Sequence, residues 1–123
     1  MYQAFGSGDV QAIPALVTDD VDWSTGAAIP SAPWYGPRHG KNGVVSFLEA
    51  IGKTGPVTEF TPLACAGNDD GDVMVFLRHA FTATATGRHA EMNMHHCWKF
   101  RDGKVCHVRS SEDTAQVAAA LTP

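Results

Sequence analysis

The feature that most constrains the fold is a stretch of strict alternation inside Ala83–Asp113. From residue 90 to residue 101 apolar and polar side chains alternate, a period that is typical of a β-strand with one buried face. Turns containing Gly87 and Gly103 flank this stretch, so the segment predicts three antiparallel strands. His96 breaks the pattern, because it places a titratable ring among apolar side chains. The set on its face is Ala90, Met92, Met94, His96, Trp98 and Phe100.

The whole chain predicts an α+β fold with an antiparallel sheet, because helices come first and strands later. At 123 residues it is expected to form a single domain, residues 1–123. Asp9 and Asp113 are good N-caps for helices. The predicted helices are 2–6, 10–17, 42–53 and 114–121, the predicted strands are 21–24, 57–66, 72–85, 89–101 and 104–111, and residues 26–40 form a loop.

Composition excludes several classes of function. The net charge is −4 and the 9 Lys and Arg residues are scattered, so no basic surface for nucleic acid is expected. No apolar run is long enough to span a membrane, and the first residues lack the basic and apolar regions of a signal peptide. The 3 Cys residues have no metal-type spacing, which favours reduced thiols in a cytoplasmic protein.

Two turns decide which side chains share a face with His96. If Gly87-Arg88 is a two-residue loop, Thr86 pairs with His89, and His79 then lies directly opposite His96. At the next turn, a two-residue loop, Asp102-Gly103, would place Val105, His107 and Arg109 on the His96 face. A three-residue loop would place Cys106, Val108, Ser110 and Glu112 there instead. We favour the three-residue loop, because Gly suits its left-handed position.

Several short motifs in this order resemble the SnoaL-like branch of the nuclear transport factor 2-like superfamily, which includes ketosteroid isomerase, scytalone dehydratase, limonene epoxide hydrolase and the polyketide cyclases. The resemblance covers nearly the whole chain and is more specific for the fold than for the reaction. The motifs are Gly8-Asp9, Thr18–Trp23, Tyr35–Gly40, Phe100–Val105 and the strand-to-helix junction Arg109–Asp113.

The resemblance implies a curved antiparallel sheet wrapped around N-terminal helices as a cone, with a deep apolar pocket. It also implies a homodimer formed through the outer face of the sheet, and it supports the three-residue turn. The residues implied to line the pocket are Trp23, Thr25, His79, Phe81, His96, Trp98, Val108 and Ser110.

Departures from the relatives argue against steroid isomerisation by the same groups. The position of the general-base Asp of ketosteroid isomerase corresponds to Thr25, and that of its protonated Asp corresponds to His96. The position of its donor Tyr falls at Met1, next to Tyr2. A catalytic Asp of limonene epoxide hydrolase corresponds to Ser110. Two pocket histidines are instead similar to those of scytalone dehydratase.

The candidate catalytic residues are His96, His79 and Ser110. An imidazole on an apolar wall can exchange protons near neutral pH, and two close imidazoles cannot both be protonated easily. His96 would act as general base or acid, and His79 would position it or a water. Ser110 or Tyr35 would hydrogen-bond the substrate oxygen. The candidate substrate-binding residues are Trp23, Thr25, Trp34, Tyr35, Phe81, Met94, Trp98, Val108 and Glu112.

Two functions of different classes remain open. The first is an enzyme that isomerises, cyclises, dehydrates or hydrates a small apolar or aromatic molecule without a cofactor. The second is a non-catalytic ligand-binding or dimerisation module, in which both histidine rings are only structural. A metal site made by His79, His96 and Glu112 is a sharper alternative, but we expect no bound metal.

Overall fold

The computed structural model describes residue 2 and residues 10–27 and 30–123. The predicted helix over residues 2–6, apart from Tyr2, and the predicted cap Asp9 lie outside the described residues. In chain order the elements are the 3₁₀ helix η1 (Val10–Leu16), β1 (Val17–Thr25), β2 (Gly36–His39), α2 (Gly40–Thr54), β3 (Val57–Gly67), β4 (Val73–Thr82), β5 (His89–Arg101), β6 (Lys104–Ser111) and α3 (Thr114–Leu121).

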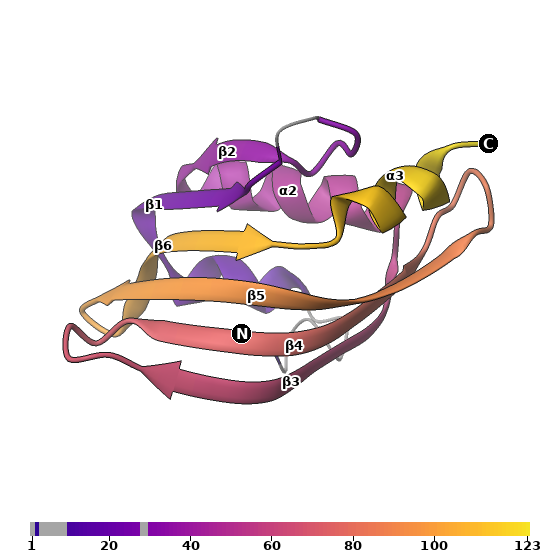
Figure 1. Cartoon of the computed structure of the whole chain (residues 1–123). Coiled ribbons are helices and arrows are strands. Elements are labelled where there is room, and N and C mark those ends of the chain that lie inside the picture. The colour runs from indigo at the N-terminus through magenta and orange to yellow at the C-terminus, as the bar shows by residue number, and fades with distance from the viewer. Residues whose placement is uncertain (1, 3–9, 28–29) are drawn as a thin grey trace.

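The six strands form one curved, open sheet in the order β2-β1-β6-β5-β4-β3 (Figure 1). The last strand, β6, therefore lies inside the sheet between β1 and β5. The β1–β6 pair is parallel and the other pairs are antiparallel, so the sheet is mixed. The α+β prediction with a curved sheet is confirmed, and the parallel pair is an addition that the sequence pattern did not indicate.

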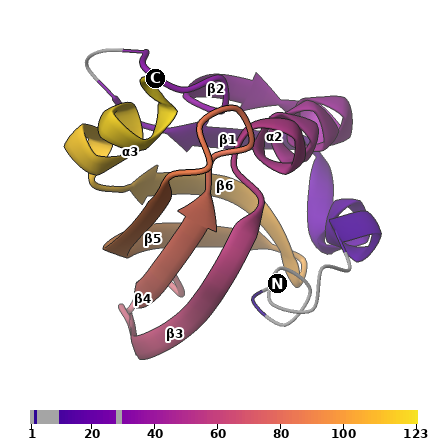
Figure 2. The ribbon, with the colours of Figure 1, turned by 90° about the vertical axis from the view of Figure 1, so that its right-hand side faces the viewer.

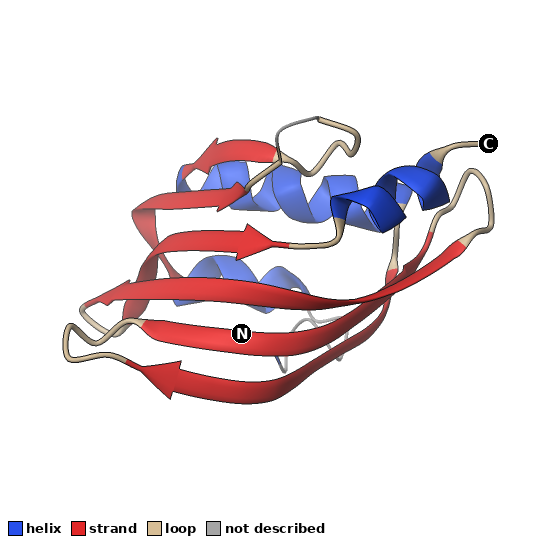
Figure 3. Ribbon diagram, viewed as in Figure 1, coloured by secondary structure: helices blue, strands red, loops and turns tan. Residues whose placement is uncertain are grey.

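The helices cover one face of the sheet and leave the other open (Figures 2 and 3). The apolar stripe of α2 buries Val44 and Phe47, and the Phe47 ring lies 5.4 Å from that of Trp23 on β1. At the other end of the chain, Asp113 caps α3 as predicted by accepting a hydrogen bond from the backbone of Gln116 at 3.1 Å. Val117 and Ala120 then attach α3 to the core.

Three predicted elements of the N-terminal third differ from the observed ones. The helix expected over 10–17 is a 3₁₀ helix that ends at Leu16, since Pro14 has no N–H to donate to an α-helical ladder. The short strand expected over 21–24 extends over the whole of β1. The loop expected over 26–40 contains β2, which pairs with β1 along Asp22–Thr25.

The β4–β5 hairpin has a longer loop than predicted. Ala83 still donates a backbone hydrogen bond to Arg88 at 2.8 Å, so the loop is residues 84–87 and not Gly87-Arg88. The register moves by four residues, which places His79 opposite Met92 and Val75 opposite His96. The predicted direct His79–His96 pair is therefore wrong. Because the shift is even, both rings stay on the inner face.

The β5–β6 turn has the length of the predicted two-residue loop and the inward-facing residues of the predicted three-residue loop. Arg101 pairs with Lys104 across Asp102-Gly103, both of which have positive φ (53° and 78°), so the loop has two residues. The favoured three-residue loop is wrong. A register shift between Lys99 and Phe100 then leaves Cys106 as the extra residue of a bulge. Beyond the bulge, Val108 and Ser110 face inward as predicted.

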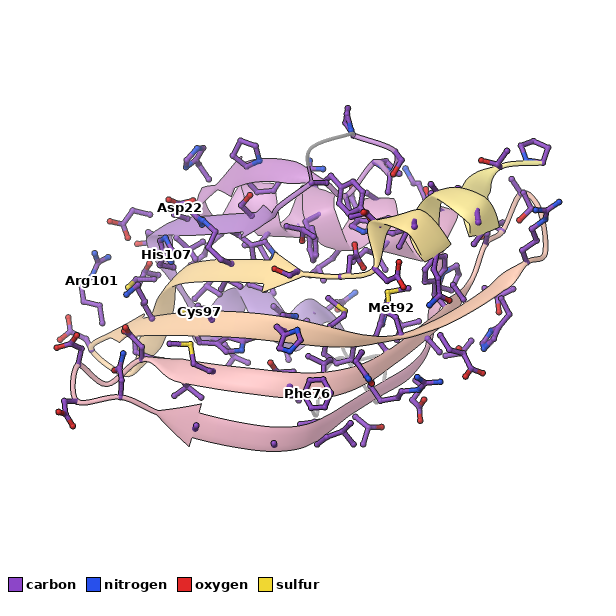
Figure 4. The ribbon with its side chains drawn as sticks, viewed as in Figure 1. Asp22, Phe76, Met92, Cys97, Arg101 and His107 are labelled. Carbon is purple, nitrogen blue, oxygen red and sulfur yellow. The ribbon has the colours of Figure 1, made fainter. Side chains whose placement is uncertain are left out.

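The outer face of the sheet carries polar side chains and a few apolar ones (Figure 4). His95 is exposed there and lies 5.1 Å from the ring of Phe76, in agreement with its predicted outward position. Asp22 also points outward and accepts hydrogen bonds from Arg109 at 3.0 and 3.1 Å. Within the part of the chain that the structure describes, no helix is long and apolar enough to cross a membrane.

Candidate functional site

A narrow cavity of about 40 Å³ lies between α2 and the inner face of the sheet. Eleven of the twelve predicted site residues line it, namely His79, His96, Ser110, Trp23, Thr25, Trp34, Phe81, Met94, Trp98, Val108 and Glu112. Tyr35 is buried beside Trp34, with ring centroids 5.9 Å apart, but does not line the cavity. The walls are mostly apolar, with several Trp and Phe rings, and no Lys or Arg lies among the described lining residues.

A chain of two hydrogen bonds holds His96 in place. The indole Nε1 of Trp98 donates to the hydroxyl of Tyr2 at 2.7 Å. The same hydroxyl lies 2.5 Å from Nδ1 of His96. The Tyr2 ring also stacks on that of His96, with centroids 5.6 Å apart. Tyr2 therefore connects the N-terminal segment to the middle of β5.

Hydrogen-bond accounting fixes the protonation of His96. An indole can only donate, so the Tyr2 hydroxyl accepts from Trp98 and has its own hydrogen left for Nδ1. Burial raises the pKa of Tyr2, so this hydrogen stays in place. His96 is then a neutral ring with its hydrogen on Nε2. Burial, with smaller effects from the nearby His79 and His95, lowers the pKa of His96 to about 3.

His79 lies on β4 and faces the same cavity. The ring of Phe60 contacts both histidines, with centroids 5.7 Å from His79 and 5.8 Å from His96. Burial lowers the pKa of His79 to about 4, although the backbone of Glu59 opposes this shift. Nδ1 of His79 is buried and meets no partner with hydrogen-bond geometry among the described residues.

Two buried hydroxyls lie between the histidines and the far end of the cavity. The Thr25 and Ser110 side chains are hydrogen-bonded to each other at 2.8 Å, and this contact joins β1 to β6. Ser110 also lies directly opposite His96 in the β5–β6 ladder. One hydroxyl of the pair keeps a hydrogen for a third partner, because a mutual bond uses only one of the two hydrogens.

Glu112 follows β6 and brings a carboxyl group to the cavity. Its Oε1 accepts a hydrogen bond from Nε1 of Trp34 at 2.6 Å. Burial raises the pKa of Glu112, and this effect is larger than the opposing effects of Trp34 and Tyr35. The Tyr35 hydroxyl is close enough to influence the carboxyl group, but it has no partner with good hydrogen-bond geometry in the described part of the chain. Burial raises the pKa of Tyr35 as well.

The metal alternative finds no support in the geometry. Among residues 2, 10–27 and 30–123, no three His, Cys, Asp or Glu side chains are grouped closely enough to hold a metal ion. His79, His96 and Glu112 share the cavity without forming such a group.

Comparison with known proteins gives the family. Residues 1–108 match the SnoaL-like domain. The chain belongs to the SnoaL-like family. A nuclear transport factor 2-like protein from Burkholderia thailandensis is 26% identical, with a TM-score of 0.87 over 99% of this chain and 92% of that chain. No match was found among curated proteins.

Two further structures share the fold of this SnoaL-like chain. A putative isomerase from Rhodopseudomonas palustris is 21% identical, with a TM-score of 0.80 over 98% of this chain and 89% of that chain. TerC, co-crystallised with polyporic acid, is 23% identical, with a TM-score of 0.85 over 98% and 91% of the two chains. At these identities the likeness concerns the fold.

Sequence reasoning missed several residues that line the SnoaL-like cavity or support its lining. Tyr2 was passed over because it lies next to the position that corresponds to the donor Tyr, yet its hydroxyl contacts His96. Phe60 could have been found from the β3–β4 register, since it lies directly opposite His79. The other missed lining residues come from α2 and the start of β3, namely Phe47, Ile51, Gly55 and Val57.

Proposed function

We propose that this SnoaL-like protein is an enzyme that transfers a proton within a small, mostly apolar molecule. The observation that carries the proposal is the Trp98–Tyr2–His96 chain, which leaves the Nε2–H of a neutral imidazole as a hydrogen-bond donor at an apolar cavity. A donor held in a dry site stabilises negative charge that develops on a substrate oxygen, and it needs no reorganisation during the reaction.

The three candidate catalytic residues then take different roles. His96 donates to the substrate oxygen, and it is a weak proton acceptor because its pKa is lowered to about 3. Ser110, paired with Thr25, supplies a second donor beside it. His79, on the adjacent strand of the same inner face, would contact the ligand or a water through its ring. Isomerisation, cyclisation and dehydration all use this combination of groups.

The volume of the cavity limits the size of the ligand. A space of about 40 Å³ admits only a few atoms at a time, since a single water needs roughly 10–15 Å³. A small ring fits if the aromatic side chains adjust, whereas a molecule of several fused rings requires the walls to move apart. That TerC was co-crystallised with polyporic acid supports an organic ligand for this fold.

A non-catalytic ligand-binding module is the second candidate. The small volume of the cavity favours this second candidate, because aromatic rings that pack closely around a small space can serve the stability of the fold without taking part in a reaction. In that case the hydrogen bond between Tyr2 and His96 only satisfies two buried polar groups. Ligand binding without turnover would separate this alternative from the enzyme.

The proposal also covers the cellular compartment and the oligomeric state of the protein. Three free thiols, Cys65, Cys97 and Cys106, support a reducing compartment such as the cytoplasm. A homodimer through the outer face of the sheet is supported by apolar side chains there, including Met74, which is 41% exposed, and Phe76. Light scattering on the purified protein, compared with Phe76→Glu, measures this association.

The function is tested with 3-cyclohexenone, a small ketone whose isomerisation to the conjugated 2-cyclohexenone is followed by ultraviolet absorbance. We expect His96→Ala to lose roughly 10²-fold in rate, as when a single oxyanion donor is removed. His95→Ala is the matched control, because His95 is the next residue on the opposite, exposed face. Equal rates for the wild type, His96→Ala and His79→Ala would contradict the enzyme proposal.

A further inference from the structure

We propose that Phe60 is the gate of the cavity and sets the size of the molecule that enters. The section of β3 from Glu59 to Pro62 swings away from β4, and the Phe60 ring leaves the cavity as a ligand enters. The inference rests on the proposed function only for the presence of a ligand in this cavity, and it does not depend on which reaction follows.

The cavity is least covered where α2 ends and β3 begins. Its half-buried lining residues are Ile51, Val57, Phe60 and Glu112, and the other described lining residues are buried. Ile51 lies in the last turn of α2, and Val57 and Phe60 lie in the first part of β3. A molecule from the solvent therefore reaches the cavity most directly between α2 and β3, past the Phe60 ring.

The Phe60 ring occupies the space that a ligand needs. Its centroid lies 5.4 Å from that of Tyr2, 5.7 Å from that of His79 and 5.8 Å from that of His96. With this ring in place the cavity measures about 40 Å³, which is too small for an aromatic molecule. If the ring moves out, a planar ring of similar size can take its place against Tyr2 and the two histidines.

The part of β3 that carries Phe60 is bounded by an irregularity at each end. β3 is an edge strand and pairs with β4 (Figure 1). The register of this pair shifts between Val57 and Glu59 and again between Pro62 and Ala64, so a bulge lies on either side of residues 59–62. Pro62 also has no N–H to donate to a neighbouring strand. This section can therefore move without breaking the pairing of the rest of β3.

The contacts that hold the section closed differ on the two faces of the sheet. On the outer face, the Glu59 carboxylate lies 3.6 Å from Nε of Arg78, and such an exposed ion pair adds little stability. On the inner face, the Phe60 ring makes its three aromatic contacts, each of which adds a modest stabilisation. Segments that admit ligands come from the less stable parts of a fold. The Phe60 ring is therefore the main lock of the gate.

Hydrogen exchange at the indole N–H of Trp98 measures the opening. Trp98 lines the cavity and donates this hydrogen to the Tyr2 hydroxyl at 2.7 Å, so exchange with D₂O requires that water reaches it. We expect Phe60→Ala to accelerate the exchange by roughly tenfold, because the loss of the aromatic contacts favours the open state. Phe100→Ala is the matched control, since Phe100 is 46% exposed and is not among the lining residues.

A disulfide bond between β3 and β4 tests the movement of the strand itself. Thr61 and Arg78 lie directly opposite each other, at a separation that a disulfide can span, so Thr61→Cys with Arg78→Cys joins the section to β4. The reduced form of the same variant is the control. We expect oxidation to slow the Trp98 exchange by roughly tenfold or more, towards the rate set by global unfolding. The native thiols are removed beforehand by Cys65→Ser, Cys97→Ser and Cys106→Ser.

Low concentrations of urea separate the gate from global unfolding. A local opening exposes little surface, so its exchange rate changes little with urea, whereas exchange through global unfolding rises steeply. The backbone amide of Val108, on the inner strand β6, reports global unfolding. If the Trp98 exchange in the wild type rises with urea as steeply as that of Val108, the gate proposal is wrong.

The variants give two further outcomes that would overturn the gate. Equal Trp98 exchange in Phe60→Ala and Phe100→Ala would show that the Phe60 ring does not close the cavity. Equal exchange in the oxidised and reduced forms of the disulfide variant would show that the β3 section does not move. These measurements need no turnover, so a failure of the gate leaves the enzyme proposal standing. A failure of the 3-cyclohexenone test with these exchange results intact would assign the gate to a binding module.

Discussion

The hydroxyl of Tyr2 lies 2.5 Å from Nδ1 of His96, although 94 positions separate the two residues in the chain. The contact determines which nitrogen of His96 carries the hydrogen, and through it which end of the ring is offered to the cavity. It also gives Trp98 the acceptor that its buried indole N–H needs. The chemistry proposed for β5 thus depends on a side chain from the opposite end of the sequence.

Tyr2→Phe tests this dependence. Removal of the hydroxyl leaves the Trp98 N–H and Nδ1 of His96 without their partner, so we expect a loss of about 1–3 kcal/mol in the free energy of unfolding. The Phe ring keeps its stacking against Phe60, so packing changes little. Urea denaturation measures the loss, and nitrogen-15 spectra of His96 should show a mixture of tautomers. An unchanged tautomer would show that Tyr2 does not fix the ring.

The two buried histidines predict instability in acid. Their pKa values are about 4 and 3 in the folded protein, against about 6.5 in an unfolded chain. Below pH 6.5 the two rings bind protons in the unfolded chain but not in the folded protein. Each ring therefore lowers the free energy of unfolding by up to roughly 1.4 kcal/mol per pH unit until its folded pKa is reached. Urea midpoints at pH 7 and pH 5 measure the effect. His96→Gln should flatten the difference, and His95→Gln should not.

Glu112 predicts the opposite dependence on pH. Its pKa is raised on folding, so its contribution to stability is fully present below its unfolded pKa and is lost as the pH rises through its folded pKa. Glu112→Gln keeps an oxygen for the Trp34 N–H and carries no charge. We therefore expect the variant to be more stable than wild type at pH 8, and the gain to disappear at pH 4. Equal midpoints at both pH values would contradict the burial effect.

Gly55 allows α2 and β4 to approach closely. A Cβ placed at this residue would lie 2.7 Å from a ring carbon of Phe81, inside the distance that real contacts allow. Gly55→Ala should therefore destabilise the protein by about 1–3 kcal/mol, the usual cost of overpacking, and shift a cavity wall. Gly52→Ala is the control, because nothing lies within 4 Å of its Cβ. That variant should gain up to about 1 kcal/mol of stability from helix propensity.

The sequence predicts the C-terminal half of this fold more closely than the N-terminal third. β5, β6 and α3 occur as expected because their alternation, turn glycines and the Asp113 cap are local signals. β2 was not predicted because it lies in a segment rich in proline. It is a short edge strand that forms only by pairing with β1. The parallel β1–β6 pair has no local signal at all, because it joins segments about 80 residues apart.

The lining of the cavity was predicted more closely than the geometry of its side chains. Alternation correctly placed Met94, His96 and Trp98 on one wall, and an even register error left His79 on that wall as well. The predicted direct contact between the two histidines is wrong because the loop after β4 comprises the four residues Thr84–Gly87, and not the two residues Gly87-Arg88. Tyr2 and Phe60 were missed because side-chain hydrogen bonds and ring contacts across distant strands leave no periodic pattern.

The central place of β6 has a consequence for how the protein is made. The ribosome releases β1 to β5 before β6, yet β6 fills the gap between β1 and β5. Until it emerges, the β1–β2 ribbon and the β3–β5 meander each carry an open edge that can pair with another nascent chain. Native contacts of such long sequence separation slow folding. A nascent chain that has grown only as far as Gly103 lacks the strand that joins the two halves, so we expect both edges to stay unpaired until β6 has been made.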